Sequence, residues 1–487
     1  MKKISALLIE HIWELILIVI FGFLFFYRLG WATLGSWDEA WYGSIARTIS
    51  QTNEWMLMQF NGKPYFDHPP MGFWLMAISY RLFGVSEFTT RLPSAFLGLL
   101  STLLLYKTSL LLFSKKVVGF SAALILGTSV WYVLRVRSGN LDSPFVFFYI
   151  LTIYFSLLSR KNMKLFPITM LAFGALMLTK TLVGASALPV IDLILFSQLL
   201  NPIKHWKWIM LGLASFVLLV LPWYYIQDKT YSNFIEHHFF TIGTRGNSAS
   251  SYFHLEYELP LFYLHMGVRK WYKLWLLAGG SLILLFKFLK PKVFIVLVWN
   301  AVILYPFLTT DETHIWHLIP VYIPLALITS YGLWSLGSTV AALIKKAKTP
   351  LQSTCKKYVT NKAVQAIYVV AIIVIAGFQI KIFYHEVIPQ NRYIADDVDI
   401  SKRVTKYDQT IYLDDDYLPL AVYYSERNMN QMAYQPEEHK TLVNLFSSSE
   451  QNFVAIARNW AVGNLDAKGI DYKILEQNGS FSIVSRP

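Results

Sequence analysis

Residues 207–226 read KWIMLGLASFVLLVLPWYYI, and among these twenty residues only Lys207 carries a charge. A helix of about 20 mostly apolar residues is long enough to cross the hydrocarbon core of a bilayer. Similar apolar runs occur along most of the chain, at 12–28, 92–113, 117–134, 143–159, 165–179, 182–200, 271–289, 293–309, 318–343 and 364–384. The sequence therefore predicts an α-helical polytopic membrane protein with about eleven transmembrane helices.

The composition supports this prediction and excludes several other classes of protein. Of the 487 residues, 55% are hydrophobic and 15% are charged, whereas a soluble domain usually carries about 25% charged residues. The single cysteine, Cys355, excludes a disulfide scaffold. The apolar content excludes a disordered chain, and the composition does not fit a collagen-like fibre.

The formal net charge of +13 is also explained by a membrane. When the N-terminus is placed in the cytoplasm, eighteen of the 43 basic residues fall in short cytoplasmic segments that are almost free of acids. Nearly all the acids between the spans fall on the other side, as the positive-inside rule predicts. An odd number of spans then places the C-terminus outside. We therefore expect a multi-pass protein of the inner or plasma membrane, with no nucleic-acid partner.

The predicted spans divide the chain into a transmembrane domain, residues 1–384, and an extracytoplasmic domain, residues 385–487. The second domain has the composition of a soluble protein, and we expect it to have a small α/β fold. Its predicted strands are 409–413, 452–456 and 472–475, and its predicted helix is 437–447. The first external loop follows the first span, and we expect it to hold two helices that lie in the membrane interface, one starting near Asp38 and one over Met71–Leu82.

The first external loop carries two acidic motifs. Asp38 and Glu39 occur in the stretch Gly35–Gly43, where a preceding serine can cap a helix whose first turn holds both acids. A capping pair is therefore the structural alternative to a catalytic role. Asp67 and His68 precede two prolines, and a rigid turn with a solvated acid and histidine is the corresponding alternative. One His and one Asp supply too few ligands for a closed zinc site, so we expect no metal here.

Basic residues also lie at the outer ends of predicted spans, where the positive-inside rule disfavours them. Arg135 and Arg137 follow the third span, and Lys180 follows the fifth. Such cations can bind an anionic headgroup or a phosphate, although Lys180 can also simply extend its charge to the interface. Asp142 lies between the third and fourth spans before Ser-Pro, where helix capping is the alternative to a functional role.

Two further connections on the same side of the membrane carry histidines. The second external loop contains Glu236-His-His238 and Arg245, and the segment before the tenth span contains His314 and His317. Acids, histidines and external cations thus come from at least five connections on one side. This joint placement predicts an active site at the outer membrane face that handles an anionic lipid. An Asp would be the general base, and Lys, Arg and His would surround the phosphate.

The ordered set of motifs resembles a known family. The motifs are Trp37-Asp-Glu-Ala-Trp-Tyr42, Lys63–Trp74, Arg91-Leu-Pro, Leu141-Asp142, Leu178-Thr-Lys180 and Leu318-Ile-Pro-Val-Tyr-Ile-Pro324. They occur in this order in the GT-C glycosyltransferases of the protein O-mannosyltransferase and lipid A aminoarabinose transferase type. The resemblance implies a GT-C fold and an inverting sugar transfer at the external face. The donor would be a polyprenyl-phosphate-linked sugar, the acceptor a hydroxyl of a lipid, glycan or protein, and no cofactor would be required.

The resemblance also assigns roles to residues of this chain. It implies that Asp38 is the general base and that Glu39 is the second member of the catalytic motif. His68 stands where the aminoarabinose transferases carry a Lys, so its contact with phosphate would be weaker or pH-dependent. Together with Arg137 from the charge pattern, the expected substrate- and phosphate-binding residues are Tyr42, Tyr65, Asp67, His68, Arg137, Asp142, Lys180, Arg245 and His317.

The alternative from another class of protein is a transporter or flippase for an anionic lipid or sugar. A transporter places ionisable residues near the middle of its spans, often beside broken helices. Here Glu14 and Asp192 are the main acids within predicted spans, and the other acids lie at external ends. This distribution favours an interfacial enzyme. A structural membrane protein with a ligand-sensing tail, a third possibility, predicts no convergence of the loop residues.

Overall fold

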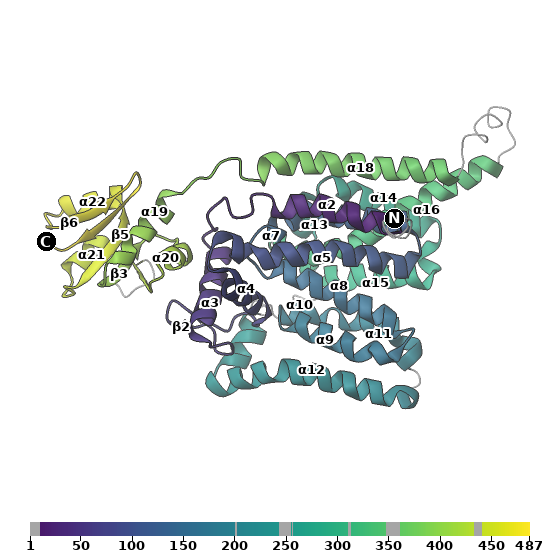
Figure 1. Ribbon diagram of the computed structural model, residues 1–487, viewed down its shortest axis with the longest axis horizontal. Coiled ribbons are helices and arrows are strands. Elements are labelled where there is room, and N and C mark those ends of the chain that lie inside the picture. Colours follow the sequence, from purple (N-terminus) through teal and green to yellow (C-terminus); the bar gives the residue numbers. More distant parts are fainter. Residues whose placement is uncertain are drawn as a thin grey trace, which may run out of the picture. The chain divides into compact units, whose positions relative to one another are not determined.

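The computed structural model describes residues 10–199, 202–242, 255, 257–309, 313–346, 361–432 and 441–487. The chain forms two compact units (Figure 1). The first unit contains residues 1–27, 66–72 and 94–388, and the second contains residues 28–65, 73–93 and 389–487. The second unit therefore joins most of the first external loop to the C-terminal segment.

The first unit is helical, and its long helices run roughly alongside one another (Figure 1). Its α-helices are α2 (Ile12–Phe26), most of α5 (Glu87–Phe113), α6 (Lys116–Gly127), α7 (Val130–Val136), α8 (Asp142–Ser159), α9 (Phe166–Met177), α10 (Thr181–Ala185), α11 (Leu188–Leu199), α12 (Pro202–Thr230), α13 (Glu258–Val268), α14 (Lys270–Leu284), α15 (Pro291–Leu304), α16 (Tyr322–Lys346) and α18 (Asn361–Glu386). Shorter helical turns are η1 (Met163–Leu165), the π-helix η2 (Glu236–Ile242), η4 (Lys287–Leu289), η5 (Tyr305–Leu308) and η6 (Ile315–Val321).

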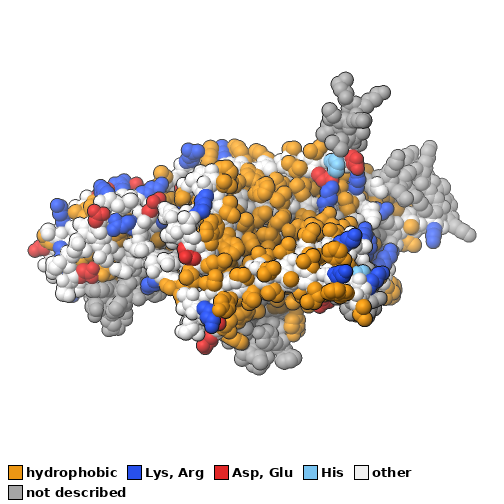
Figure 2. Space-filling view, turned by 60° about the horizontal axis from the view of Figure 1, so that its bottom comes forward, with side chains coloured by type: hydrophobic (Ala, Val, Ile, Leu, Met, Phe, Trp, Pro, Cys, Tyr) orange, Lys and Arg blue, Asp and Glu red, His pale blue; other side chains and the backbone are white. Residues whose placement is uncertain are grey.

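Six helical segments among the described residues are long and apolar enough to cross a membrane. They are Glu87–Phe113, Asp142–Ser159, Ile203–Thr230, Pro291–Leu308, Ile315–Ile344 and Ala363–Glu386. Hydrophobic side chains cover much of the face of the helical part that Figure 2 shows, as expected for a surface in contact with lipid. The chain is thus a multi-pass membrane protein, as predicted.

The predicted number of eleven spans stays a prediction, because the other apolar segments form shorter or bent helices. Three of them are the helices Ile12–Phe26, Met163–Met177 and Thr181–Phe196, and a fourth is α14 with 15 residues. The segment predicted at 117–134 is divided into α6 and α7, which bend by 71°. Hydropathy measures only the apolar content of a segment and does not show where a helix stops or turns.

A buried glutamine stabilises the bend between α6 and α7. Gln379 of α18 donates hydrogen bonds from Nε2 to the carbonyl oxygens of Thr128, at 2.7 Å, and Val268, at 3.3 Å. The indole Nε1 of Trp271 donates to the Thr128 hydroxyl at 3.1 Å. A break in a membrane helix frees backbone carbonyls that lipid cannot satisfy, so a neighbouring helix must supply the donors. These contacts hold α7, which carries Arg135, in its bent direction.

The second unit contains a five-stranded sheet with helices on both faces. Its strands are β3 (Thr410–Asp414), β4 (Asn430–Gln431), β5 (Phe453–Arg458), β6 (Lys473–Gln477) and β7 (Phe481–Ser485), in the order β4-β3-β5-β7-β6. β3 is parallel to β4 and β5, whereas β7 is antiparallel to β5 and β6. The helices of the unit are α3 (Asp38–Thr52), most of α4 (Met71–Phe83), α19 (Asp396–Arg403), η7 (Val404–Lys406), α20 (Leu418–Ser425), α21 (Leu442–Ser447) and α22 (Asn459–Asp466).

The strands predicted in the C-terminal segment coincide with β3, β5 and β6. The helix predicted at 437–447 coincides with α21 over residues 442–447, and its residues 437–440 lie outside the described residues. The two helices predicted in the first external loop are α3 and α4. Strands β4 and β7 were not predicted. β4 has only two residues, and a strand that short gives no alternation of polar and apolar residues.

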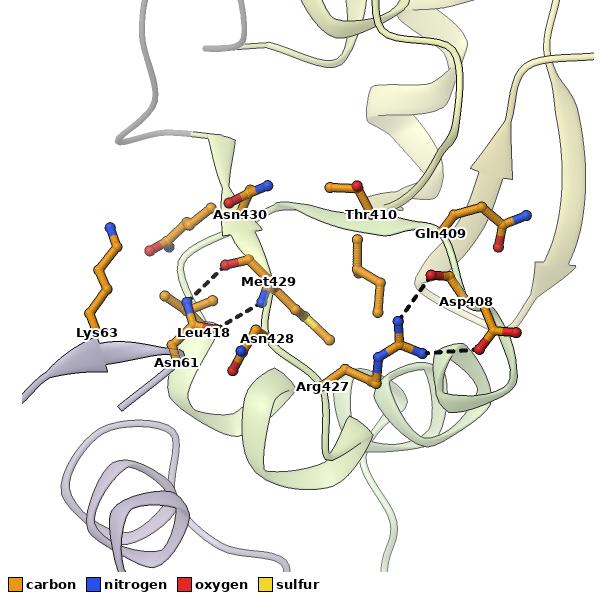
Figure 3. Close-up of a pocket in the computed structure, with 12 residues that line it drawn as sticks. Asn61, Lys63, Asp408, Gln409, Thr410, Leu418, Arg427, Asn428, Met429 and Asn430 are labelled. Carbon is orange, nitrogen blue, oxygen red and sulfur yellow. Dashed lines mark hydrogen bonds and ion pairs between the residues drawn. The ribbon is translucent and has the colours of Figure 1, made fainter. Parts of the chain in front are cut away.

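A hairpin of the first external loop is attached to the C-terminal segment. Strands β1 (Gln59–Phe60) and β2 (Lys63–Pro64) are joined by Asn61 and Gly62, which both have positive φ, as a type I′ turn requires. The Asn61 amide donates to the Met429 carbonyl at 2.8 Å and accepts from the Met429 N–H at 2.8 Å. A polar pocket of about 580 Å³ lies beside this contact (Figure 3).

The helix that carries Asp38 is attached in the same way. Arg47 of α3 is buried and donates to the carbonyl oxygens of Val422, at 3.0 Å, and Tyr423, at 2.5 Å, at the C-terminal end of α20. Cations are favourable at this end of a helix. The contacts explain why α3 and the C-terminal segment form one unit. The predicted boundary between a transmembrane domain and an extracytoplasmic domain, between residues 384 and 385, stays a prediction.

Candidate functional site

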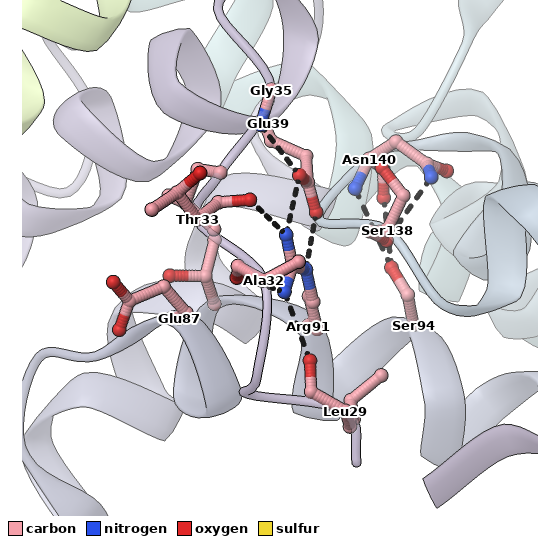
Figure 4. A network of polar contacts seen from close by, with 12 residues as sticks. Leu29, Ala32, Thr33, Gly35, Glu39, Glu87, Arg91, Ser94, Ser138 and Asn140 are labelled. Carbon is pink, nitrogen blue, oxygen red and sulfur yellow. Dashed lines mark hydrogen bonds and ion pairs between the residues drawn. The ribbon is translucent and has the colours of Figure 1, made fainter. Parts of the chain in front are cut away.

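In the second unit, Glu39 is buried and bound by Arg91 (Figure 4). Arg91 donates from Nε to Glu39 Oε1 at 2.7 Å and from Nη2 to Oε2 at 2.9 Å, and the Gly35 N–H donates to Oε2 at 2.8 Å. Arg91 also donates to three backbone carbonyl oxygens of the preceding loop, those of Leu29, Ala32 and Thr33. The paired side chains therefore fix the loop that leads into α3 and its first residue, Asp38.

Aromatic side chains surround this helix. Tyr42 and Tyr65 are both buried and both meet the ring of Phe73 edge-on, with ring centroids 5.2 and 5.6 Å apart. Tyr65 also meets Trp41 edge-on at 5.7 Å. Asp38, at the first turn of α3, is partly buried. The structure thus brings together Asp38, Glu39, Tyr42 and Tyr65, which come from two separate parts of the first external loop.

In the first unit, two cations bind one buried carboxylate. Asp142, at the start of α8, is 4% exposed. Arg135 of α7 donates from Nε to Asp142 Oδ2 at 2.5 Å, and Lys180 donates from Nζ to Oδ1 at 2.5 Å. Removing either cation would leave the buried carboxylate with one partner fewer, which is costly. Two cations and one carboxylate leave one net positive charge, which suits an anionic ligand.

His68 lies near these charges. Burial, and then the positive charge of Lys180, lowers the pKa of His68 to about 4. The imidazole is therefore neutral at pH 7 and can donate one hydrogen bond without adding positive charge. This refines the expectation of a pH-dependent contact, because titration of His68 falls well below neutral pH.

The loop with Asp67 and His68 is held by two histidines of the π-helix η2. His237 Nε2 lies 2.6 Å from Asp67 Oδ1. His238 is buried, which lowers its pKa, and its Nε2 lies 3.0 Å from the hydroxyl of Thr181, the residue after Lys180. Its Nδ1 lies 3.2 Å from the carbonyl oxygen of Phe66. The second external loop therefore links the Asp67–His68 segment to the start of α10.

Three other predicted residues have different surroundings. Arg137 is buried and donates to the backbone carbonyl oxygens of Leu24, Phe25 and Tyr27, where it caps the C-terminal end of α2. The Nδ1 atom of His317 accepts from the His314 N–H at 3.1 Å. Its neighbour Trp316 stacks with the guanidinium of Arg135, 5.3 Å from the ring centroid. Arg245 lies outside the described residues.

The list of expected binding residues omitted three residues that the geometry makes important, although Arg135 had been singled out with Arg137 as an external cation. Arg135 binds Asp142, although Arg137 was preferred for the phosphate. The charge pattern placed both arginines at one helix end but could not distinguish their directions. His237 and Arg91 were visible only as part of motifs, and nothing in the sequence paired them with Asp67 and Glu39. Among the described residues, no three His, Cys, Asp or Glu side chains are grouped as metal ligands.

Comparisons with known proteins agree with this fold. Residues 67–226 match the family model of the dolichyl-phosphate-mannose-protein mannosyltransferases. The chain is 27% identical to the undecaprenyl phosphate-alpha-4-amino-4-deoxy-L-arabinose arabinosyl transferase of Pectobacterium carotovorum, and 29% identical to that of Aeromonas hydrophila. Each alignment covers 67% of this chain and 60% of the relative. An uncharacterized protein of Aquifex aeolicus is 29% identical, over 32% of each chain.

Solved structures show the same fold. ArnT from Cupriavidus metallidurans, solved with bound undecaprenyl phosphate, superposes with a TM-score of 0.69 at 18% identity, covering 97% of this chain and 98% of that one. The archaeal oligosaccharyltransferase AglB from Archaeoglobus fulgidus gives a TM-score of 0.51 at 13% identity, covering 86% and 65%. The fold is that of a GT-C glycosyltransferase. The resemblance to the aminoarabinose transferase and O-mannosyltransferase type is thereby confirmed, although the chain spans only 60% of the length of the curated transferases quoted above.

Proposed function

We propose that the protein is a membrane glycosyltransferase that moves a sugar from a polyprenyl-phosphate donor to a hydroxyl acceptor at the external membrane face. The observation that carries the proposal is the buried Asp142, bound by both Arg135 and Lys180. The carboxylate fixes the two cations, and their net positive charge suits a phosphate that must leave as an anion. The likeness to transferases whose names include undecaprenyl phosphate supports this class of donor.

In this mechanism the chemistry is a single displacement. The acceptor oxygen attacks the anomeric carbon while the bond from that carbon to the phosphate oxygen breaks, which inverts the configuration. The polyprenyl phosphate leaves with the electron pair, and Arg135 and Lys180 stabilise its charge. Asp38 takes the proton of the acceptor hydroxyl. The neutral imidazole of His68 donates a hydrogen bond to the phosphate.

Glu39 has a positioning role in this proposal. Its carboxylate is engaged by Arg91 and by the Gly35 N–H. It holds the start of α3, and therefore Asp38, in place. Tyr42 and Tyr65 form the wall beside Asp38, and Asp67 is oriented by His237. The acceptor is a lipid, glycan or protein, and the protein acts in the cell envelope, with its N-terminus in the cytoplasm and its C-terminal segment outside.

The test is transfer from a labelled donor by the purified full-length protein in liposomes. Undecaprenyl-phosphate-linked mannose and 4-amino-4-deoxyarabinose serve as the donor probes, with membrane lipid extract supplying acceptors. We expect Asp38→Asn to abolish transfer and Glu54→Gln, which alters an exposed acid of the same loop, to leave it unchanged. Wild-type transfer by Asp38→Asn would remove Asp38 as the base. Movement of labelled lipid across the bilayer without any transfer would favour the transporter alternative.

A further inference from the structure

A second cluster of cations lies at the far end of α8 from Asp142. Asp142 begins this helix of 18 residues, and Arg160 follows its last residue. At 1.5 Å per residue the two ends are about 27 Å apart, close to the thickness of the hydrocarbon core. Arg160 borders a pocket of about 610 Å³. This pocket is therefore separate from the site around Asp142.

The pocket combines basic residues with apolar walls. Its basic residues are Arg160, Lys161, Lys290 and Lys292, and within the described part of the chain no acidic residue lines it. The Nζ atom of Lys292 donates to the Leu111 carbonyl oxygen, at the end of α5, at 2.9 Å. These four basic residues line the same pocket, so their like charges repel one another. A bound anion would relieve this repulsion.

The four basic residues, called the charged rim here, follow the end of α8 or flank the start of α15, and the apolar walls come from the membrane helices. They consist of Leu111, Leu112 and Phe113 from the end of α5, Leu157 from α8, Pro291 and Val293 from α15, and Tyr331 from α16. The rings of Phe113 and Tyr331 stack with centroids 4.2 Å apart. α15 starts at Pro291, so the positive end of its dipole also faces this rim. A charged rim above an apolar wall matches a phosphate headgroup above acyl chains.

We propose that this pocket binds one anionic phospholipid. Its phosphate lies between Arg160, Lys161, Lys290 and Lys292. An acyl chain lies against the wall formed by Leu157 and the stacked rings of Phe113 and Tyr331. In the predicted topology the lipid belongs to the cytoplasmic leaflet. The proposal does not depend on the chemistry at Asp142, and it concerns the opposite membrane face. It also differs from a diffuse attraction of basic loops to a charged surface, because it assigns binding to one pocket.

The experiment uses full-length protein purified in detergent and freed of lipid, with native mass spectrometry as the readout. Phosphatidylglycerol, phosphatidylethanolamine and inorganic phosphate are the three probes. We expect wild-type protein to retain one phosphatidylglycerol in preference to phosphatidylethanolamine. The triple variant with Lys161→Gln, Lys290→Gln and Lys292→Gln should bind phosphatidylglycerol at least roughly tenfold more weakly, because it loses three of the four cations that line the pocket.

The matched control removes the same charge elsewhere on the same predicted side. The control variant replaces three exposed lysines outside the pocket, by Lys115→Gln, Lys164→Gln and Lys207→Gln. It should bind lipid as the wild type does. Equal weakening in both triple variants would show diffuse charge attraction and overturn the proposal. Competition by inorganic phosphate at the affinity of the lipid would indicate a free anion as the ligand instead. If the pocket variant fails to fold, equal retention of the two lipids by wild-type protein would also overturn it.

Discussion

Arg91 binds both carboxylate oxygens of Glu39, at 2.7 and 2.9 Å, although the two residues are 52 positions apart in the chain. Both side chains are less than 10% exposed. The pair closes the loop that precedes α3 and determines where Asp38 lies. Its geometry leads to the first prediction.

Arg91→Lys should lower stability and transfer activity together. Lysine keeps the charge but cannot make the two parallel bonds or reach the three loop carbonyls. Disrupting a buried pair in this way costs roughly 3–5 kcal/mol when a charge is left without its partner, and lysine should recover part of this. Thermal unfolding of the purified protein measures the effect. Arg81→Lys, on the exposed side of α4, is the control, and an equal loss in both variants would contradict the role given to Arg91.

Lys180→Ala should raise the Michaelis constant for the donor and leave that for the acceptor nearly unchanged. A hydrogen bond between charged groups contributes about 1.5–3 kcal/mol, so the increase should be roughly tenfold to a hundredfold. Lys180→Arg should restore much of the donor affinity, because it keeps the charge next to Asp142. Transfer assays at varied donor and acceptor concentrations provide the measurement. A larger effect on the acceptor would place Lys180 elsewhere in the reaction.

Stability should decrease as the pH falls from about 6.5 to about 4, and part of this decrease should disappear in His68→Gln. The pKa of His68 in the folded protein is about 4, below the ordinary value of about 6.5. The unfolded chain therefore binds more protons in this range, and protonation favours unfolding. The contribution is roughly 1–3 kcal/mol. Thermal unfolding at pH 7 and pH 4.5 tests it, with His265→Gln, an exposed histidine, as the control. An unchanged pH dependence in His68→Gln would refute the assignment.

Gly72→Ala should impair transfer by moving the residue beside Asp142. A methyl group on Gly72 would lie 2.2 Å from Leu141 Cδ2, so the Leu141 side chain would have to shift. Overpacking of this kind costs about 1–3 kcal/mol. Gly280→Ala is the control, since a methyl group there meets nothing within 4 Å. Transfer rates and unfolding temperatures of both variants provide the comparison. Full activity with Gly72→Ala would show that the position of Leu141 does not matter to the site.

The sequence predicted the separate elements of the site better than their contacts. Asp38, Asp142 and Lys180 were singled out as candidates because acids and cations at helix ends stand out against apolar spans. The sequence could not distinguish Arg135 from Arg137. Side chains two positions apart on a helix point in widely different directions, and only the packing of the neighbouring helices decides which of them faces the acid. In the structure one binds Asp142 and the other caps α2.

The sequence by itself determined that this chain lies in a membrane, roughly where its apolar segments lie, and which connections carry charge. These properties follow from the local cost of placing polar groups in lipid, which depends only on the residues of one segment. Only the tertiary structure decided that the segment 117–134 is bent, that Gln379 donates hydrogen bonds to a backbone carbonyl at this bend, and that Glu39 binds Arg91. Such contacts join residues far apart in the chain, and they depend on the packing of whole helices.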